Sequence, residues 1–290
     1  MNEGKWMERL RALVAGMERR FGRGVVTPLP TPAEGQDIAA PAGHVATGIA
    51  ALDAVLGGSG LPRGAMVELF GQEGVGKTSL ALALAAAVQR EGGVVAWIDV
   101  ERALQPAYAT KAGIDPGRML LSRPEDAEEA LEVAEALARS GEVALIVVDS
   151  VAALVPRQEA ERSLDDDAPG GPGRLLSRAL PRLALALHDS GCSAVFVNQV
   201  RRELGDAGGH APTGGGTALR HYAAVRLELG QAGPLKGDGP PAGAAVRVEV
   251  VKSRYGAPGQ QALLTLRYGR GFGTDPMALP LPPPVGMALG

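Results

Sequence analysis

The sequence is poor in several features that would each point to a class of protein. Its 290 residues include a single cysteine, Cys192, which excludes an internal disulfide framework and favours a reducing compartment. No apolar run approaches the length of a membrane span, and the opening residues MNEGKWMERL are polar and charged. We therefore expect a cytoplasmic protein without a membrane partner, in which Cys192 is a small core residue.

Aromatic residues and net charge are scarce as well. Aromatics make up 3% of the chain, so its core must consist mainly of Ala, Val and Leu. The formal net charge of -3 offers no broad basic surface, which means that any nucleic-acid site must be local. The length suits one large α/β domain with small appendages.

What the chain does contain is a regular alternation of strand-like and helix-like runs. The runs AMVELF, GVVAWIDV, VALIVVDSV and CSAVFVNQV predict strands, and the stretches between them predict helices. This alternation is typical of a parallel sheet covered on both faces. Three later runs, HYAAVRLELG, AAVRVEVVKSR and QALLTLRYG, are expected to add antiparallel strands. Pro181 is expected to interrupt the helix before CSAVFVNQV.

The ends of the chain have a different character. Apolar residues spaced four, three, four and four apart predict an amphipathic helix within residues 1–24, and a Pro/Gly-rich linker follows at 25–44. Such a helix must dock on its own core or on a neighbouring molecule. The main domain is expected at 45–275, followed by a Pro-rich tail at 276–290. The apolar stripe consists of Trp6, Leu10, Leu13, Met17 and Phe21.

A phosphate-binding motif lies between a predicted strand and a predicted helix. GQEGVGKT, from Gly71 to Thr78, fits G-x-x-x-x-G-K-[ST], in which backbone N–H groups and the helix N-terminus surround phosphates. Lys77 would reach the β- and γ-phosphates and Thr78 would bind Mg²⁺. We expect ATP to be held by Gly71, Gln72, Glu73, Gly74, Val75, Gly76, Lys77, Thr78 and Ser79.

Acidic residues end two neighbouring predicted strands. Asp149 follows VALIVV and is expected to hold the metal together with Thr78. Asp99 and Glu101 end the run VVAWID and the turn after it, and a carboxylate there could activate the attacking water. Spacing alone does not decide whether either of these two acids has that role.

Taken together, the motifs resemble the RecA family of bacterial recombinases. The resemblance runs from Met7 to about Gly271 through TGIAALDAVLGGSGLPRG, GQEGVGKTSL, AWIDVERALQPAYATKAGID, ALARSGEVALIVVDSVAALVP, FVNQV, GGGTALRHYAAVRLEL and VVKSRYGAP. It implies a RecA-type ATPase core, an N-terminal oligomerisation helix and filament formation on single-stranded DNA. It further implies Glu101 as the water-activating base, Tyr108 against adenine, Gln199 as γ-phosphate sensor, and Lys252 and Arg254 on a neighbour's ATP.

The resemblance also implies two DNA-binding loops. In the first, EAERSLDDDAPGGPGRLLSRAL, Arg174 and Ser177 match contacts to backbone phosphates. The second follows Gln199 and reads VRRELGDAGGHAPTGGGTALRH. Its expected phosphate-binding residues are Arg201, Arg202 and Arg220.

Several positions depart from the family pattern. The second loop carries Glu203 and Asp206 and no bulky wedge residue, and the first gains three adjacent aspartates. His221 replaces an interface aromatic, the family's late tyrosine near adenine falls close to Asp275, and the C-terminal lobe is expected to be absent.

Two functions therefore stay open. One is a DNA-dependent ATPase of recombination, repair and the SOS response to DNA damage. The other is an ImuA-like accessory paralogue that binds RecA, a translesion polymerase or both, with weak strand exchange.

Overall fold

The computed structural model describes residues 3–27, 43–161, 171–200, 216–235 and 241–273. The chain divides into two compact units, Met1–Asp37 and Ile38–Gly290. The first contains helix α1, Glu3–Phe21, which is continuous over the predicted apolar stripe. None of the described helices is both long enough and apolar enough to cross a bilayer.

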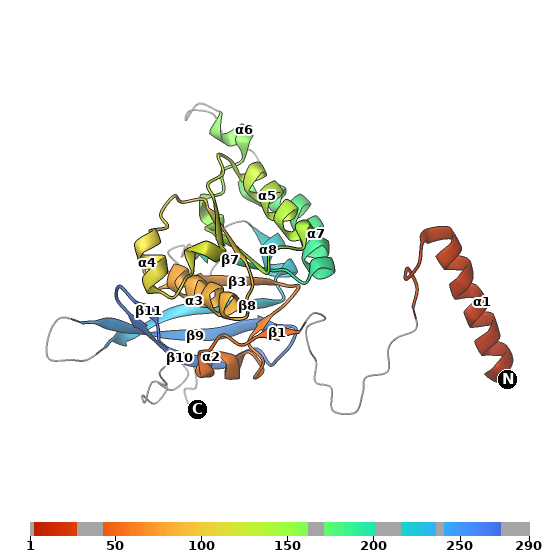
Figure 1. Cartoon of the computed structure of the whole chain (residues 1–290), viewed down its shortest axis with the longest axis horizontal. Coiled ribbons are helices and arrows are strands. Elements are labelled where there is room, and N and C mark those ends of the chain that lie inside the picture. Colours follow the sequence, from red (N-terminus) through yellow and green to blue (C-terminus); the bar gives the residue numbers. More distant parts are fainter. Residues whose placement is uncertain (1–2, 28–42, 162–170, 201–215, 236–240, 274–290) are drawn as a thin grey trace, which may run out of the picture. The chain divides into compact units, whose positions relative to one another are not determined.

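The larger unit is built on a nine-stranded sheet (Figure 1). Its order is β11-β10-β9-β8-β3-β7-β6-β4-β5, and the strands from β8 to β5 pair in parallel. A separate pair joins β1 (His44–Val45) to β2 (Leu61–Pro62). The sheet strands are β3 (Met66–Gly71), β4 (Val95–Asp99), β5 (Met119–Ser122), β6 (Leu145–Asp149), β7 (Ser193–Gln199), β8 (Val225–Pro234), β9 (Gly243–Ser253), β10 (Gln261–Arg267) and β11 (Gly271–Phe272).

Two hydrophobic cores cover the two faces of this sheet. One contains α2 (Ala50–Val55), α3 (Lys77–Arg90) and α4 (Pro106–Lys111), and the other contains α5 (Ala127–Ser140), α7 (Gly171–Ser190) and α8 (Thr217–Tyr222). Alternate strand residues serve each core: Trp97 points to the first and Ile98 to the second. Short helices η1 (Pro116–Arg118), η2 (Val151–Ala153) and α6 (Arg157–Ala160) complete the described elements.

Small side chains take the place of aromatic ones in the packing. The central helix α3 buries a series of alanines, including Ala81, Ala85 and Ala86, which lets its backbone approach the sheet closely. Cys192 is 1% exposed and belongs to the second core, as the sequence predicted, and burial raises the pKa of its thiol to about 12.

Two sequence expectations need correction. The first of the three late strands, β8, pairs with β3 in parallel rather than antiparallel, because the connection from Gln199 to Val225 is long enough for the crossover that parallel strands need. Only β9, β10 and β11 are antiparallel additions. Pro181 does not interrupt its helix either: α7 runs through it, held by buried Leu180 and Leu183 on the sheet side.

Candidate nucleotide-binding site

The phosphate-binding motif closes the carboxyl end of β3. Gly71 ends that strand, and a Cβ on it would lie 2.3 Å from the carbonyl oxygen of Leu229. Gly76, the residue that caps the N-terminus of α3, has φ of 99°, and a Cβ there would meet the Leu266 side chain at 2.8 Å. Both positions therefore require glycine, and the loop between them turns toward the N-terminus of α3, a favourable place for phosphate.

Lys77 is the first residue of α3 and is buried against the same loop. Its Nζ donates to the carbonyl oxygens of Gly71 at 3.1 Å and Gln72 at 2.7 Å. Burial lowers the pKa of this amine, an effect that Asp149, Glu101 and Glu73 oppose. The amine thus lies among carboxylates at the position from which it can reach bound phosphate.

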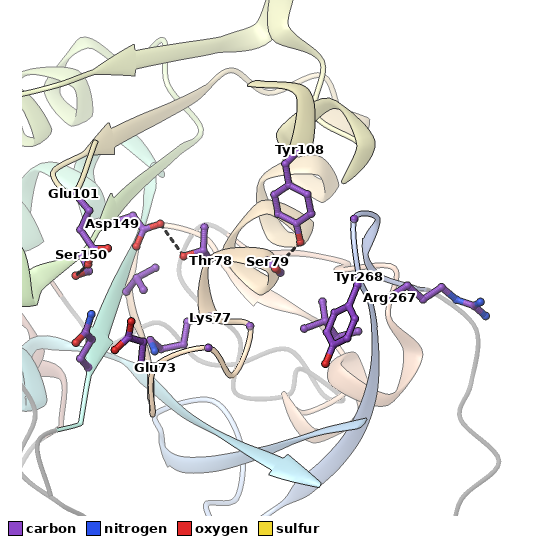
Figure 2. Close-up of a pocket in the computed structure, with 16 residues that line it drawn as sticks. Glu73, Lys77, Thr78, Ser79, Glu101, Tyr108, Asp149, Ser150, Arg267 and Tyr268 are labelled. Carbon is purple, nitrogen blue, oxygen red and sulfur yellow. Dashed lines mark hydrogen bonds between the residues drawn. The ribbon is translucent and has the colours of Figure 1, made fainter. Parts of the chain in front are cut away.

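Thr78 and Asp149 lie together at the ends of α3 and β6. The Thr78 hydroxyl donates to Asp149 Oδ2 at 3.0 Å (Figure 2). The pKa of the Asp149 carboxyl is raised to about 6, mainly by burial and also by the Glu101 and Asp99 charges, although the Thr78 hydrogen bond and Lys77 oppose the shift. A cation would favour the ionised carboxylate, so this pair of oxygen ligands fits Mg²⁺, which commonly takes one or two protein carboxylates plus phosphate oxygens.

The two acids after β4 have different environments. Asp99 is 2% exposed, accepts a hydrogen bond from the Ala103 backbone at 2.9 Å and pairs with Arg123. Glu101 lines the pocket and accepts a hydrogen bond from the Ser150 hydroxyl. Of the two, only Glu101 is placed among the residues around the pocket, so geometry favours it as the base.

The opposite end of the pocket carries two tyrosines. The Tyr108 hydroxyl, on α4, is 2.6 Å from the Ser79 hydroxyl, and Tyr268 follows β10 (Figure 2). Tyr268, its neighbour Arg267 and Ser150 also line the pocket, although the sequence motifs indicate no role for them. In the sequence, Tyr268 could have been suspected as a pocket residue only because it lies at the end of the predicted strand QALLTLRYG. Asp275 lies outside the described residues.

Gln199 completes the pocket from the end of β7. The cavity measures about 400 Å³ and joins the carboxyl ends of β3, β6 and β7 to the turn after β10. Its lining includes Glu73, Gly74, Gly76, Lys77, Thr78, Ser79, Glu101, Tyr108, Asp149, Ser150, Gln199, Arg267, Tyr268 and Gly269. Of the predicted ATP residues, Gly71, Gln72 and Val75 stand in the loop but do not line this cavity.

Lys252 and Arg254 do not reach this pocket. Lys252, on β9, donates to the carbonyl oxygens of Arg220 at 2.8 Å and His221 at 2.9 Å, and Arg254 donates to the latter at 3.3 Å. Lys252 lines a second cavity, which we call the basic recess. It is formed by Thr217, Arg220, His221, Arg226, Val251 and Lys252.

The predicted DNA-binding residues are only partly described. Arg174 is exposed on α7, and the Ser177 hydroxyl donates to the Gly173 carbonyl oxygen at 2.8 Å. Arg220 lies on α8 and lines the basic recess. Arg201 and Arg202, with Glu203 and Asp206, lie outside the described residues.

Comparison with known proteins gives the same family across the chain. The family model described as the RecA N-terminal domain matches residues 8–273. The chain is 43% identical to Protein RecA of Nocardia farcinica over 267 residues, which is 92% of this chain and 76% of that protein. It is 44% identical to Protein RecA of Thermus thermophilus over 281 residues, which is 96% of this chain and 80% of that protein.

A solved structure shares the fold at lower sequence similarity. The crystal structure of the RadB recombinase superposes with a TM-score of 0.59 and 24% identity, covering 79% of this chain and 98% of that one. This likeness concerns the fold, a large and mostly parallel mixed sheet with antiparallel strands at one side.

Proposed function

The chain belongs to the RecA family, and from that premise we propose that it is an ATPase stimulated by single-stranded DNA, with a role in DNA repair and recombination. Hydrolysis would be coupled to assembly of a filament through α1. The observation that carries this proposal is the set of complementary groups around one cavity: Lys77, the Thr78–Asp149 pair and Glu101.

Each group has a task that follows from its position. Lys77 exchanges its loop carbonyl partners for phosphate oxygens, because an ammonium binds an anion more strongly than a neutral carbonyl. Thr78 and Asp149 would hold Mg²⁺, which neutralises charge on the phosphates when bound. Glu101, oriented by Ser150, takes a proton from the water that attacks the γ-phosphate.

The ends of the pocket divide the substrate between them. Tyr108 and Tyr268 offer aromatic surface for the adenine ring at the end of the pocket away from Glu101 (Figure 2). Gln199 offers an amide at the phosphate end, where it would sense whether a γ-phosphate is present. Because residues 201–215 follow directly, that state would be passed to the predicted second DNA loop.

Lys252 and Arg254 would act on the nucleotide of a neighbouring subunit. Lys252 lines the basic recess and Arg254 lies beside it. Neither residue lines the nucleotide pocket of its own chain. A cation supplied by a neighbour stabilises charge in the transition state and makes hydrolysis depend on assembly.

The decisive experiment measures ATP turnover and particle shape with and without single-stranded DNA. We expect turnover to rise and filaments to appear by electron microscopy when DNA is added. Turnover that is the same with and without DNA, and particles that stay short, would count against this function.

A second candidate function rests on the sequence of the DNA loops. The segment ELGDAGGHAPT has two acids and no bulky side chain beyond Leu204, so it lacks surface for stacking on bases. An accessory paralogue that binds RecA or a translesion polymerase would need no strand exchange. Efficient three-strand exchange by the purified protein would exclude this candidate, whereas tight binding to either protein without exchange would favour it.

A further inference from the structure

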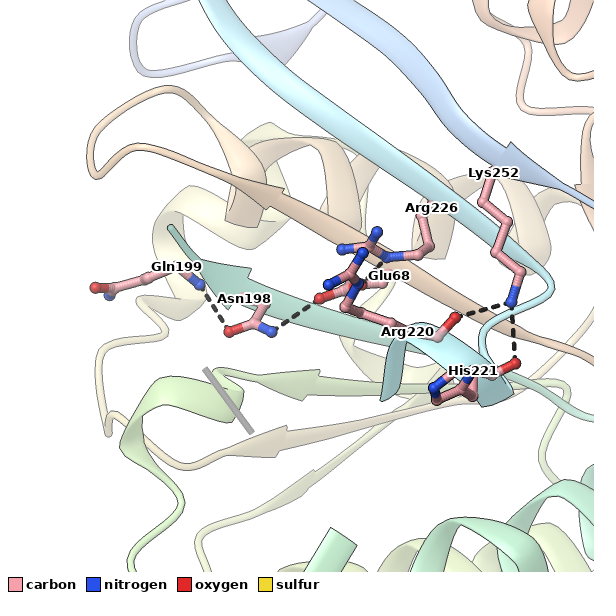
Figure 3. Close-up of polar contacts among 7 residues, drawn as sticks. All are labelled: Glu68, Asn198, Gln199, Arg220, His221, Arg226 and Lys252. Carbon is pink, nitrogen blue, oxygen red and sulfur yellow. Dashed lines mark hydrogen bonds and ion pairs between the residues drawn. The ribbon is translucent and has the colours of Figure 1, made fainter. Parts of the chain in front are cut away.

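A buried carboxylate lies in the middle of the sheet, on the face that α7 and α8 cover. Glu68 of β3 is 0% exposed, and its two oxygens take hydrogen bonds from different neighbouring strands. Asn198 Nδ2 of β7 donates to Oε1 at 2.9 Å, and Arg226 Nε of β8 donates to Oε2 (Figure 3). The Arg226 guanidinium also stands 4.5 Å from the centre of the Phe70 ring. We call Glu68, Asn198 and Arg226 the buried triad.

One end of the buried triad contacts the nucleotide pocket. Asn198 Oδ1 accepts a hydrogen bond from the backbone N–H of Gln199 at 2.9 Å. Gln199 itself lines the pocket at the carboxyl end of β7. A shift of the Gln199 backbone therefore acts on the Asn198 amide, whose other end is bound to Glu68.

The other end of the buried triad contacts the basic recess. Arg226 lines this recess and lies directly opposite Lys252 in the pairing of β8 with β9. The Lys252 amine is held by the carbonyl oxygens of Arg220 and His221, at the end of α8. Burial lowers the pKa of the Lys252 amine, and the charges of Arg254 and Arg226 lower it too, whereas Glu68 raises it. The amine therefore interacts electrostatically with both members of the Glu68–Arg226 ion pair.

The pairing of β8 with β9 is irregular at this point. Arg226 pairs with Lys252 but the next residue, Leu227, pairs with Val250, so Val251 is an extra residue in β9. A bulge of this kind interrupts the ladder and redirects neighbouring side chains. Lys252 thus lies beside a bulge, where β9 can be displaced more easily than where its pairing with β8 is regular.

We infer that the buried triad couples Gln199 to Lys252 within one subunit, so that a γ-phosphate in the pocket changes the placement of the Lys252 amine. The three members are positioning residues, because none of them lines the nucleotide pocket. The coupling follows from burial: Glu68 and Arg226 cannot be left unpaired without a large cost, so a displaced Asn198 moves them together. This inference rests on the proposed function of Gln199 as the γ-phosphate sensor.

The test measures Lys252 directly, by its rate of acetylation in the full-length protein, read by mass spectrometry. The protein is saturated with Mg²⁺ and either ADP or a non-hydrolysable ATP analogue, without DNA. In the wild type we expect the two rates to differ about fivefold or more, the low end of common coupling between sites. A low and a high protein concentration are compared, because a difference caused by contact between copies would grow with concentration.

Two variants break the triad in different ways. Glu68→Gln removes the charge that holds Arg226 and should make the two acetylation rates equal, at a cost in thermal stability. The pair Glu68→Met with Arg226→Met replaces buried charge with apolar volume, so it should regain stability without regaining the rate difference. A role in stability alone would predict that the rate difference returns with the melting temperature.

A matched control removes a carboxylate with two arginine partners elsewhere. Glu135 on α5 binds Arg139 and Arg182, and Glu135→Gln should keep the wild-type rate difference. Equal rates in the wild type, or an unchanged difference in both triad variants, would overturn the coupling. DNA-stimulated turnover of the wild type is measured alongside: its absence refutes the proposed function while leaving the acetylation result to decide the coupling.

Discussion

The nucleotide pocket and the basic recess are both clusters of charged side chains on one sheet, but they differ in the balance of sign. In the pocket, Lys77 lies among Glu73, Glu101 and Asp149. The residues described around the recess include Arg220, Arg226 and Lys252 and carry no carboxylate. The pocket therefore offers the groups that the proposed function requires, a metal ligand, a base and a phosphate partner, whereas the described lining of the recess offers cationic groups and no carboxylate.

Under the proposed function, the chemistry of hydrolysis belongs to the pocket, and the recess contributes through its positive charge. With no carboxylate among its described lining residues, the recess has no metal ligand like Asp149, however well it binds an anion. Within its own chain, Lys252 does not line the nucleotide pocket. The recess can therefore contribute to hydrolysis only when a negatively charged group from another molecule enters it. Substitutions in the two places should accordingly change different quantities.

The largest expected effect is loss of the base in the pocket. Glu101→Gln keeps the hydrogen bond to Ser150 but cannot take a proton, so kcat for ATP should fall about 10³-fold, within the usual range for general-base catalysis. The dissociation constant of the nucleotide should stay within a few-fold of the wild type. Single-turnover hydrolysis and nucleotide binding measure the two separately. Glu91→Gln, far from the pocket on the Arg63 ion pair, is the matched control.

The next largest expected effect is the loss of Lys252, which we propose acts on the nucleotide of a neighbouring subunit. Lys252→Gln should lower DNA-stimulated kcat about 10²-fold, the scale for loss of one group that stabilises transition-state charge. Nucleotide affinity should be unchanged, because the amine does not line the pocket.

Mixing two inactive variants shows where Lys252 acts. Lys77→Ala disables a pocket but keeps an intact recess, so mixed filaments of Lys77→Ala and Lys252→Gln should regain part of the lost turnover. If every mixture is as inactive as its components, Lys252 does not act on a neighbouring subunit, and the proposed division of roles between pocket and recess is wrong.

A smaller effect follows from the raised pKa of Asp149. Folding raises this pKa from 3.8 to about 6, so the protonated carboxyl competes with Mg²⁺ below about pH 6. Mg²⁺-dependent nucleotide affinity should fall about tenfold per pH unit below that point, since one proton is displaced on binding. Asp149→Asn, measured in parallel, reports the titration of the nucleotide itself. A decline that begins only near pH 4 would show that Asp149 is not desolvated in solution.

The same shift predicts the sign of a stability change. The unfolded chain loses the Asp149 proton near pH 3.8 and the folded chain only near 6. Raising the pH across this window therefore lowers the free energy of unfolding through this group, and Mg²⁺ binding should reverse the loss.

Sequence sufficed for the parts of the molecule that depend on local pattern. The glycines at 71 and 76, Lys77 and Thr78 follow from a motif whose spacing is fixed by phosphate geometry, and the structure brings Asp149 to Thr78 as expected. The strand β5 gave no clear pattern, because its four residues lie at a sheet edge with Leu120 and Leu121 half exposed. The direction of β8 could not be read either, since it depends on which strand it joins.

The buried triad shows a second limit of sequence reasoning. Glu68, Asn198 and Arg226 each interrupt an apolar strand, and in sequence a polar residue there has no visible partner. Their relation depends on three strands that are far apart along the chain and adjacent only in the sheet. Tyr268 escaped notice for the same reason: it follows β10, which lies three places from β3 in the sheet, and only the fold brings it beside the phosphate loop.

The smallest effect concerns DNA, and it sharpens the contrast between binding charge and doing chemistry. Arg174 is exposed on α7 and is expected to contact a backbone phosphate. Arg174→Ala should weaken binding to single strands by a few-fold regardless of sequence, and should reduce the salt dependence of log K by about 0.7, the share of one phosphate contact. Titrations of labelled oligonucleotides at several salt concentrations measure this slope. Arg139→Ala, on the neighbouring helix α5 and already paired with Glu135, should leave the slope unchanged. Equal slopes for all three proteins would mean that Arg174 makes no contact with a DNA phosphate, and that Arg220 in the recess is the described arginine to test next.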